Sequence, residues 1–157
     1  MSRSESRSLE VAAVQLESQD DVAQNLARVS ELVAAAARRG ARLVLLPENF
    51  AFMGGSEAEK RELAETIEVE PSERDGRILR RLRELAREHA LTLVGGGMPE
   101  KSDDHDRPFN TSVVVGPDGR VAARYRKIHL FDVEVGDGHT YRESASTSAG
   151  EAPVTAT

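Results

Sequence analysis

The sequence contains no cysteine among its 157 residues and no tryptophan, and only 4% of its residues are aromatic. Without cysteine, the chain itself can form no disulfide, no thiolate metal site and no thiol nucleophile. No stretch approaches the roughly 18 consecutive apolar residues of a membrane span, and the first ten residues contain no apolar signal segment. These absences favour a cytoplasmic protein that does not bind a membrane.

The charge balance also excludes a class of partner. The net charge is −6, which argues against general binding to nucleic acid. Arginines in stretches such as residues 80–84 alternate with glutamate, as is typical of a solvated helix face. The length and the 39% hydrophobic content suit a single domain with a buried core. We expect this domain at residues 9–157, after a disordered polar arm at residues 1–8.

The apolar pattern predicts an α/β fold. Short apolar runs alternate with helical periodicity, and the short connections between them imply parallel strands joined by right-handed crossovers. A hairpin turn at residues 116–119 then adds two antiparallel strands, so the sheet should be mixed. Residues 132–157 show no periodicity, and we expect no strand or helix there. The predicted strands lie at 11–16, 42–47, 91–94, 110–115 and 121–125, and the predicted helices at 22–39, 57–66 and 78–89.

Two charged residues follow predicted strands. Glu48 comes directly after an apolar run that reads as a strand buried on both faces, which Pro47 ends. Ligands of α/β sheets bind at this end of the strands, where a carboxylate can act as a general base. Lys127 follows the second strand of the hairpin. If the two strands point the same way, Glu48 and Lys127 should share a pocket, although each alone could be an ordinary solvated side chain.

Other motifs favour no cofactor and no metal. Three glycines at residues 95–97 would let backbone or a ligand approach closely, but they lack the spacing of a nucleotide-binding loop. There is no Gly-x-Ser-x-Gly nucleophile motif, and the four histidines do not have the spacing of metal ligands.

Three motifs together resemble the nitrilase, or carbon–nitrogen hydrolase, superfamily. They are Leu-Leu-Pro-Glu-Asn-Phe at 45–50, Tyr-Arg-Lys-Ile-His-Leu-Phe-Asp-Val-Glu at 125–134, and Tyr-Arg-Glu-Ser at 141–144. Glu143 follows Lys127 by 16 residues, which is similar to the amidase branch. Within that branch, the motifs resemble the ω-amidases and deaminated-glutathione amidases.

The resemblance implies a fold, an assembly and a chemistry. It implies a four-layer α-β-β-α sandwich, paired as a homodimer, that hydrolyses small linear amides such as ω-amides of keto acids and releases ammonia. Glu48 would be the general base, Lys127 the cation that stabilises the tetrahedral intermediate, and Glu143 an auxiliary carboxylate. A cysteine would form a thioester with the substrate.

This sequence departs from the family pattern because it has no cysteine. We expect it to be the N-terminal part of the sandwich, truncated before the strand that carries the nucleophile, and to be inactive alone. The alternative is a non-enzymatic interaction or scaffold domain with the same fold. A reading frame that continues to a cysteine would favour the amidase, and a stop codon would favour the scaffold.

Overall fold

The computed structural model describes residues 8–54, 56–136 and 140–156. The predicted disordered arm therefore lies, except for Ser8, outside the described residues. In chain order the elements are β1 (Val11–Ala13), α1 (Val22–Arg38), β2 (Leu43–Leu45), α2 (Glu57–Glu62), α3 (Arg77–Glu88), β3 (Thr92–Glu100), β4 (Phe109–Val115), β5 (Val121–Arg126), β6 (Asp132–Glu134), β7 (Thr140–Arg142) and a 3₁₀ helix (Glu143–Ala145).

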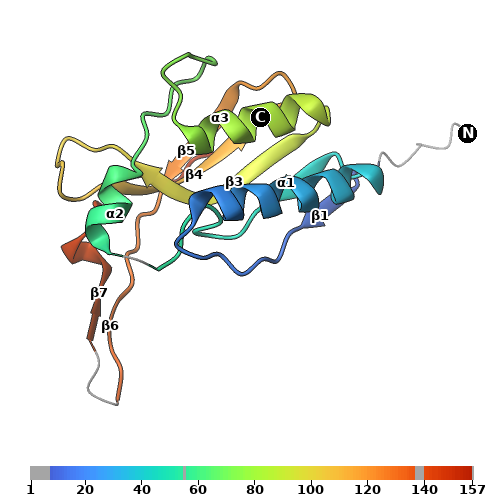
Figure 1. Ribbon diagram of the computed structural model, residues 1–157. Coiled ribbons are helices and arrows are strands. Elements are labelled where there is room, and N and C mark those ends of the chain that lie inside the picture. Colours follow the sequence, from blue (N-terminus) through green and yellow to red (C-terminus); the bar gives the residue numbers. More distant parts are fainter. Residues whose placement is uncertain (1–7, 55, 137–139, 157) are drawn as a thin grey trace, which may run out of the picture.

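A five-stranded mixed sheet in the order β1-β2-β3-β4-β5 forms the centre of the molecule (Figure 1). The first three strands are parallel, and β4 and β5 are each antiparallel to their predecessor. Strands β2 and β5 therefore point the same way. The α/β class and the mixed sheet that the sequence predicts are confirmed.

Helices α1 and α3 cover one face of this sheet (Figure 1). Helix α1 begins after Asp21, whose carboxylate accepts hydrogen bonds from two backbone N–H groups of the first turn. Its residues Val29 and Val33 are fully buried, as are Ile78 and Leu82 of α3. Burying such a side chain is worth about 1.5–3 kcal/mol, so each of these residues contributes substantially to the stability of the fold.

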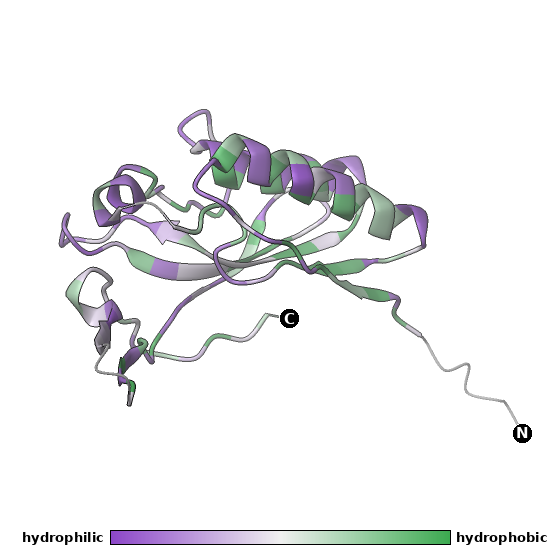
Figure 2. Ribbon diagram, turned by 60° about the horizontal axis from the view of Figure 1, so that its bottom comes forward, coloured by the Kyte–Doolittle hydropathy of each residue, from purple (hydrophilic) through white to green (hydrophobic). Residues whose placement is uncertain are grey.

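In the part of the chain that the structure describes, no helix covers the opposite face of the sheet. Figure 2 shows the helices on one side and the last residues of the chain on the other. On this open face Val11 is 52% exposed and Leu45 is 39% exposed, whereas Val44 on the helix side is completely buried. The expectation that the strand before Glu48 is buried on both faces is therefore wrong.

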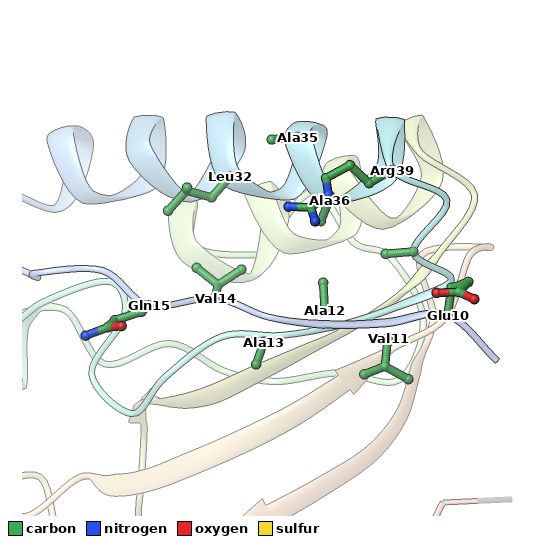
Figure 3. A pocket seen from close by; sticks show the side chains of 11 residues that line it. Glu10, Val11, Ala12, Ala13, Val14, Gln15, Leu32, Ala35, Ala36 and Arg39 are labelled. Atoms are coloured by element: carbon green, nitrogen blue, oxygen red, sulfur yellow. The ribbon is translucent and has the colours of Figure 1, made fainter.

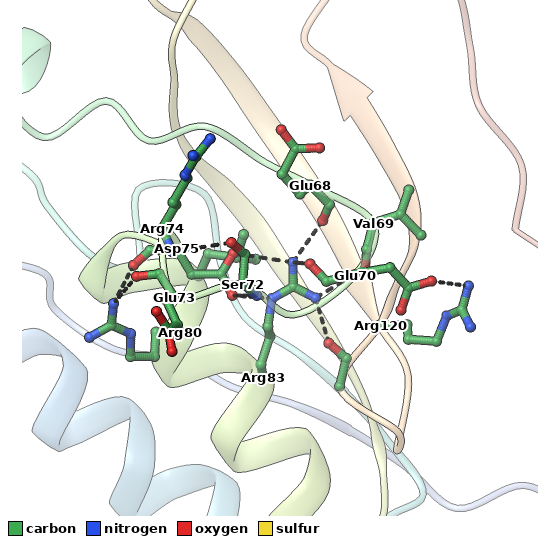
Figure 4. Close-up of polar contacts among 12 residues, drawn as sticks. Glu68, Val69, Glu70, Ser72, Glu73, Arg74, Asp75, Arg80, Arg83 and Arg120 are labelled. Atoms are coloured by element: carbon green, nitrogen blue, oxygen red, sulfur yellow. Dashed lines mark hydrogen bonds and ion pairs between the residues drawn. The ribbon is translucent and has the colours of Figure 1, made fainter.

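A buried arginine holds α3 to the connection that precedes it (Figure 4). Arg83 is only 1% exposed, and its Nε lies 2.9 Å from Oδ2 of Asp75 as an ion pair. Its two terminal nitrogens donate to four backbone carbonyls, among them those of Glu68 and Gly119. A buried charge needs this many partners, because an unpaired one would be very unfavourable.

Four predicted elements differ from the structure by more than one residue in length. The first two strands are three residues long, shorter than predicted. Helix α2 ends at Glu62 rather than near residue 66, because the backbone of Glu65 pairs with the end of β3 instead. Strand β3 is longer than predicted and runs through all three glycines to Glu100.

The expectation that residues 132–157 contain no strand or helix is also wrong. Strands β6 and β7 form a hairpin that projects away from the sheet, followed by the 3₁₀ helix (Figure 1). The rings of Phe131 and Tyr141 pack beside it, with centroids 5.8 Å apart. Three-residue strands that are largely exposed on both faces leave no hydropathy alternation in the sequence, so the pattern could not predict them.

Candidate active site

The ends of β2 and β5 bring Glu48 and Lys127 together. Glu48 lies three residues beyond the last residue of β2, and Lys127 directly follows β5. Because the two strands point the same way, both residues lie at the same edge of the sheet. The Nζ of Lys127 is 3.0 Å from Oε1 of Glu48. The two residues share one site, as expected if their strands run in the same direction.

Glu143 contacts the same lysine. It opens the 3₁₀ helix after β7, and its Oε2 lies 3.0 Å from Nζ of Lys127. The same oxygen accepts a 2.7 Å hydrogen bond from the backbone N–H of Phe131. All three residues singled out in the sequence therefore meet, with the ammonium of Lys127 between two carboxylates.

The electrostatics of this cluster favour the charged forms of Lys127 and Glu143. Burial acts to lower the pKa of Lys127, but hydrogen bonds and charge attraction from Glu143 and Glu48 outweigh it, so the pKa is raised above its usual value. Burial acts to raise the pKa of Glu143, but bonds from the Phe131 N–H and from Lys127 outweigh it, so this pKa is lowered. At neutral pH the site thus presents an ammonium beside an ionised carboxylate.

A small cavity of about 230 Å³ opens at the cluster on the uncovered face of the sheet. The Glu48 side chain is 49% exposed, against 27% for Lys127 and 16% for Glu143. Glu48 is therefore accessible from this cavity rather than sealed in apolar surroundings. The residues that line it are Glu48, Gly96, Asn110, Ser112, Tyr125 and Lys127.

Asn110 is a member of this site that reasoning from the sequence missed. Its Nδ2 donates a 2.6 Å hydrogen bond to Oε1 of Glu48, although 62 residues separate them. The signal that could have revealed it is a lone amide near the start of a strand with three valines at its other end. Asparagine is depleted from strands, so one at a buried strand position has a specific partner.

The three glycines make room for this arrangement. A Cβ at Gly96 would collide with the backbone of Leu46 and Pro47, and one at Gly97 would lie 2.6 Å from Oδ1 of Asn110 and 3.2 Å from Cγ of Glu48. The close approach expected of them is therefore an approach of the protein's own chain. It is β2 and its continuation to Glu48 that come close to β3.

The wider cavities of the molecule lie elsewhere. One of about 400 Å³ between β1 and α1 is lined mainly by apolar side chains such as Val14 and Leu32 (Figure 3). Glu10 and Arg39 are its only charged members. Glu48, Lys127 and Glu143 do not line this cavity, so it is separate from the charged site. Within the described residues, no group of three or more histidine, aspartate or glutamate side chains could hold a metal ion.

The fold and the cluster define an α/β protein with a charged site at one edge of its sheet. The profile of the carbon–nitrogen hydrolase family matches residues 10–157, and the chain belongs to that family. It is 40% identical over 141 residues to a deaminated glutathione amidase from Synechocystis sp. (strain PCC 6803 / GT-S), covering 89% of this chain and 49% of that protein. It is 37% identical over 144 residues to human omega-amidase NIT2, covering 92% and 49%.

Solved structures of the nitrilase superfamily have the same fold. Saccharomyces cerevisiae Nit3, of branch 10 of that superfamily, matches with a TM-score of 0.76 and 30% identity, over 94% of this chain and 51% of that one. An amidase from Nesterenkonia sp. AN1, with acrylamide added at its active-site cysteine, matches with a TM-score of 0.71 and 25% identity, over 93% and 51%. The chain spans about half the length of these relatives.

Proposed function

We propose that this chain supplies the base, the cation and the auxiliary carboxylate of an amidase. The observation that carries the proposal is the position of the Lys127 amine, 3.0 Å from Glu48 and 3.0 Å from Glu143 at the carboxyl edge of the sheet. An inert scaffold would not require three charged groups to converge beside an open cavity. Family membership supports the same reaction class.

In the proposed mechanism, Glu48 takes the proton of a cysteine thiol, and the thiolate attacks the amide carbon. The ammonium of Lys127 stabilises the negative charge that develops on the carbonyl oxygen. The carbon–nitrogen bond then breaks, and the protonated Glu48 returns its proton to the departing ammonia. Glu48 next takes a proton from water, whose oxygen attacks the thioester. The carbon–sulfur bond then breaks and Glu48 returns the proton to the departing thiolate, which releases a carboxylic acid and the thiol. Glu143 holds Lys127 in place and in its charged form.

The nucleophile has to come from outside these 157 residues, because the sequence has no cysteine. The chain alone is therefore inactive in this proposal. The proposed substrates are small linear amides, of the kind implied by the names of the deaminated glutathione amidase and omega-amidase relatives. We further propose that the active protein is a cytoplasmic homodimer. The net charge of −6 carried by these 157 residues disfavours nucleic acid as a partner.

A chimera tests the function. The chain is joined to the unmatched half of the Synechocystis relative, and ammonia release from deaminated glutathione and from α-ketoglutaramate is measured. We expect release by the chimera and none by the 157-residue chain. A chimera that folds cooperatively but releases no ammonia from either amide would refute the proposal, as would release by the chain alone.

A further inference from the structure

We propose that Asn110 is the positioning residue of this site and decides which oxygen of Glu48 accepts the proton. Its side chain and its backbone contact two different members of the cluster. The Nδ2 donates to Oε1 of Glu48 at 2.6 Å, and the carbonyl oxygen accepts from the backbone N–H of Lys127 at 2.8 Å. One residue thereby fixes both the carboxylate and the segment that carries the ammonium.

The surroundings of Asn110 are built around these bonds. Its exposed fraction is 6%, so its amide needs partners inside the protein. The pairing of β3 with β4 is irregular between Gly95 and Met98, and Asn110 lies opposite Pro99. Gly97 leaves the space that the amide and the Glu48 side chain occupy. The local sequence of both strands thus accommodates a single polar contact.

The contact distinguishes the two oxygens of Glu48. Oε1 accepts from both Asn110 Nδ2 and Lys127 Nζ, at 2.6 and 3.0 Å. No hydrogen bond from the described part of the chain reaches Oε2. Two donors on one oxygen fix the rotation of the carboxylate and leave the other oxygen to accept a proton. This catalytic meaning rests on the proposed function, whereas the positioning itself can be measured without any reaction.

The test is acylation of Lys127 in the 157-residue chain, measured by mass spectrometry relative to exposed Lys101. Asn110→Ala frees Glu48 to turn away, so Lys127 should react about two- to fivefold faster, the effect of losing one partly exposed ion pair. Ser112→Ala is the matched control. Its hydroxyl, on the same strand and beside the same cavity, donates to the carbonyl of Gly95 and not to the cluster. Ser112→Ala should therefore leave the ratio of Lys127 acylation to Lys101 acylation unchanged.

A double-mutant cycle separates positioning from a general loss of structure. In a Glu48→Gln background, Asn110→Ala should change the acylation ratio no further, because its effect passes through the carboxylate. An equal effect in both backgrounds, or no effect in a folded Asn110→Ala protein, would overturn the proposal.

A second measurement needs no change at Asn110. Glu48→Gln should speed hydrogen exchange of the Asn110 side-chain amide and leave that of Asn25, which binds two backbone carbonyls, unaltered. Unchanged exchange at Asn110 would also contradict the proposal. Neither readout involves amide hydrolysis. An inactive chimera would therefore refute the proposed function without refuting the role of Asn110, and unchanged acylation and exchange would refute that role without refuting the function.

Discussion

At the scale of single residues, Lys127 is the centre of the site. Its amine contacts two carboxylates that arrive from segments 95 residues apart in the sequence, one after β2 and one after β7. An ammonium between two carboxylates stays protonated at neutral pH and has little freedom to move. That is the state required of a group that stabilises an oxyanion, because its position costs no reorganisation during the reaction.

Glu143 should make the stability of the chain sensitive to acid. The pKa of Glu143 in the folded state is below the usual value. Its contribution to the free energy of unfolding is therefore complete above about pH 4.5 and is lost as the pH falls through the folded pKa. Glu143→Gln removes this contribution. Urea unfolding should therefore show the variant less stable than wild type at pH 7, with the difference shrinking on acidification below pH 4.5. Glu57→Gln, on an exposed helix end, is the control; a difference at Glu143 that grows with acidity would contradict the assignment.

The sequence could nominate Glu48, Lys127 and Glu143 because each lies in a motif shared with a family. It did not show which residue Asn110 contacts, because the partner of Asn110 is 62 residues away and its hydrogen bond exists only once β3 and β4 have paired. Nor could it predict that Glu48 is half exposed, since apolar neighbours in sequence need not be neighbours in space. Such contacts depend on the register of the sheet, which hydropathy patterns do not specify.

At the scale of elements, α3 is fixed by polar contacts at its N-terminal end. Two oxygens of buried Glu65 accept from the N–H groups of Ile78 and Leu79, because the N-cap residue, Gly76, has no side chain to do so. Arg83, one turn further along, binds the carbonyls of the preceding connection (Figure 4). The helix thus depends on residues that lie before it in the chain.

Arg83→Ala should be among the most destabilising single changes in the protein. It leaves Asp75 buried without its ion-pair partner, a situation that typically lowers the free energy of unfolding by about 3–5 kcal/mol. The exposed ion pair of Arg28 with Glu31 on α1 is the control. Arg28→Ala should lower the free energy of unfolding by only about 0–1 kcal/mol. Urea denaturation of both variants measures the difference; equal effects would show that the Arg83 network contributes no special stability.

The elements that the sequence predicts best are those in which apolar residues recur regularly over many positions. Helices α1 and α3 and the β4–β5 hairpin were predicted to within a few residues, since each combines periodicity with a cap or turn signal. Strand β3 was predicted too short because glycines usually mark the end of a strand. Here they continue it, because neighbouring backbone occupies the space that side chains would fill.

At the scale of the whole molecule, the main feature is a sheet whose helices, among the described residues, cover one face only. Apolar side chains such as Val11 and Leu45 are exposed on the other face. Exposed apolar surface of this kind is suited to contact with another layer of protein. Among the described residues no helix is long and apolar enough to cross a membrane.

The open face should make the 157-residue chain bind a hydrophobic dye and unfold at a lower temperature than the chimera. Leu45→Lys should reduce dye fluorescence, because it places a charge on that face. Val69→Lys, at a residue 55% exposed outside the strands, should leave the fluorescence unchanged. Cooperative unfolding of the monomeric chain at a high temperature, with no dye binding, would contradict this view of the sheet.

The most direct test of the central claim, that Glu48 is the base of an amidase site, is the kcat/KM of the chimera with and without Glu48→Gln. Gln keeps the size of Glu48 but cannot accept a proton, so we expect kcat/KM for amide hydrolysis to fall by about a hundredfold to ten-thousandfold. The exposed change Glu57→Gln should leave it unaltered. A Glu48→Gln chimera that hydrolyses the amide as fast as the unchanged chimera would contradict the account.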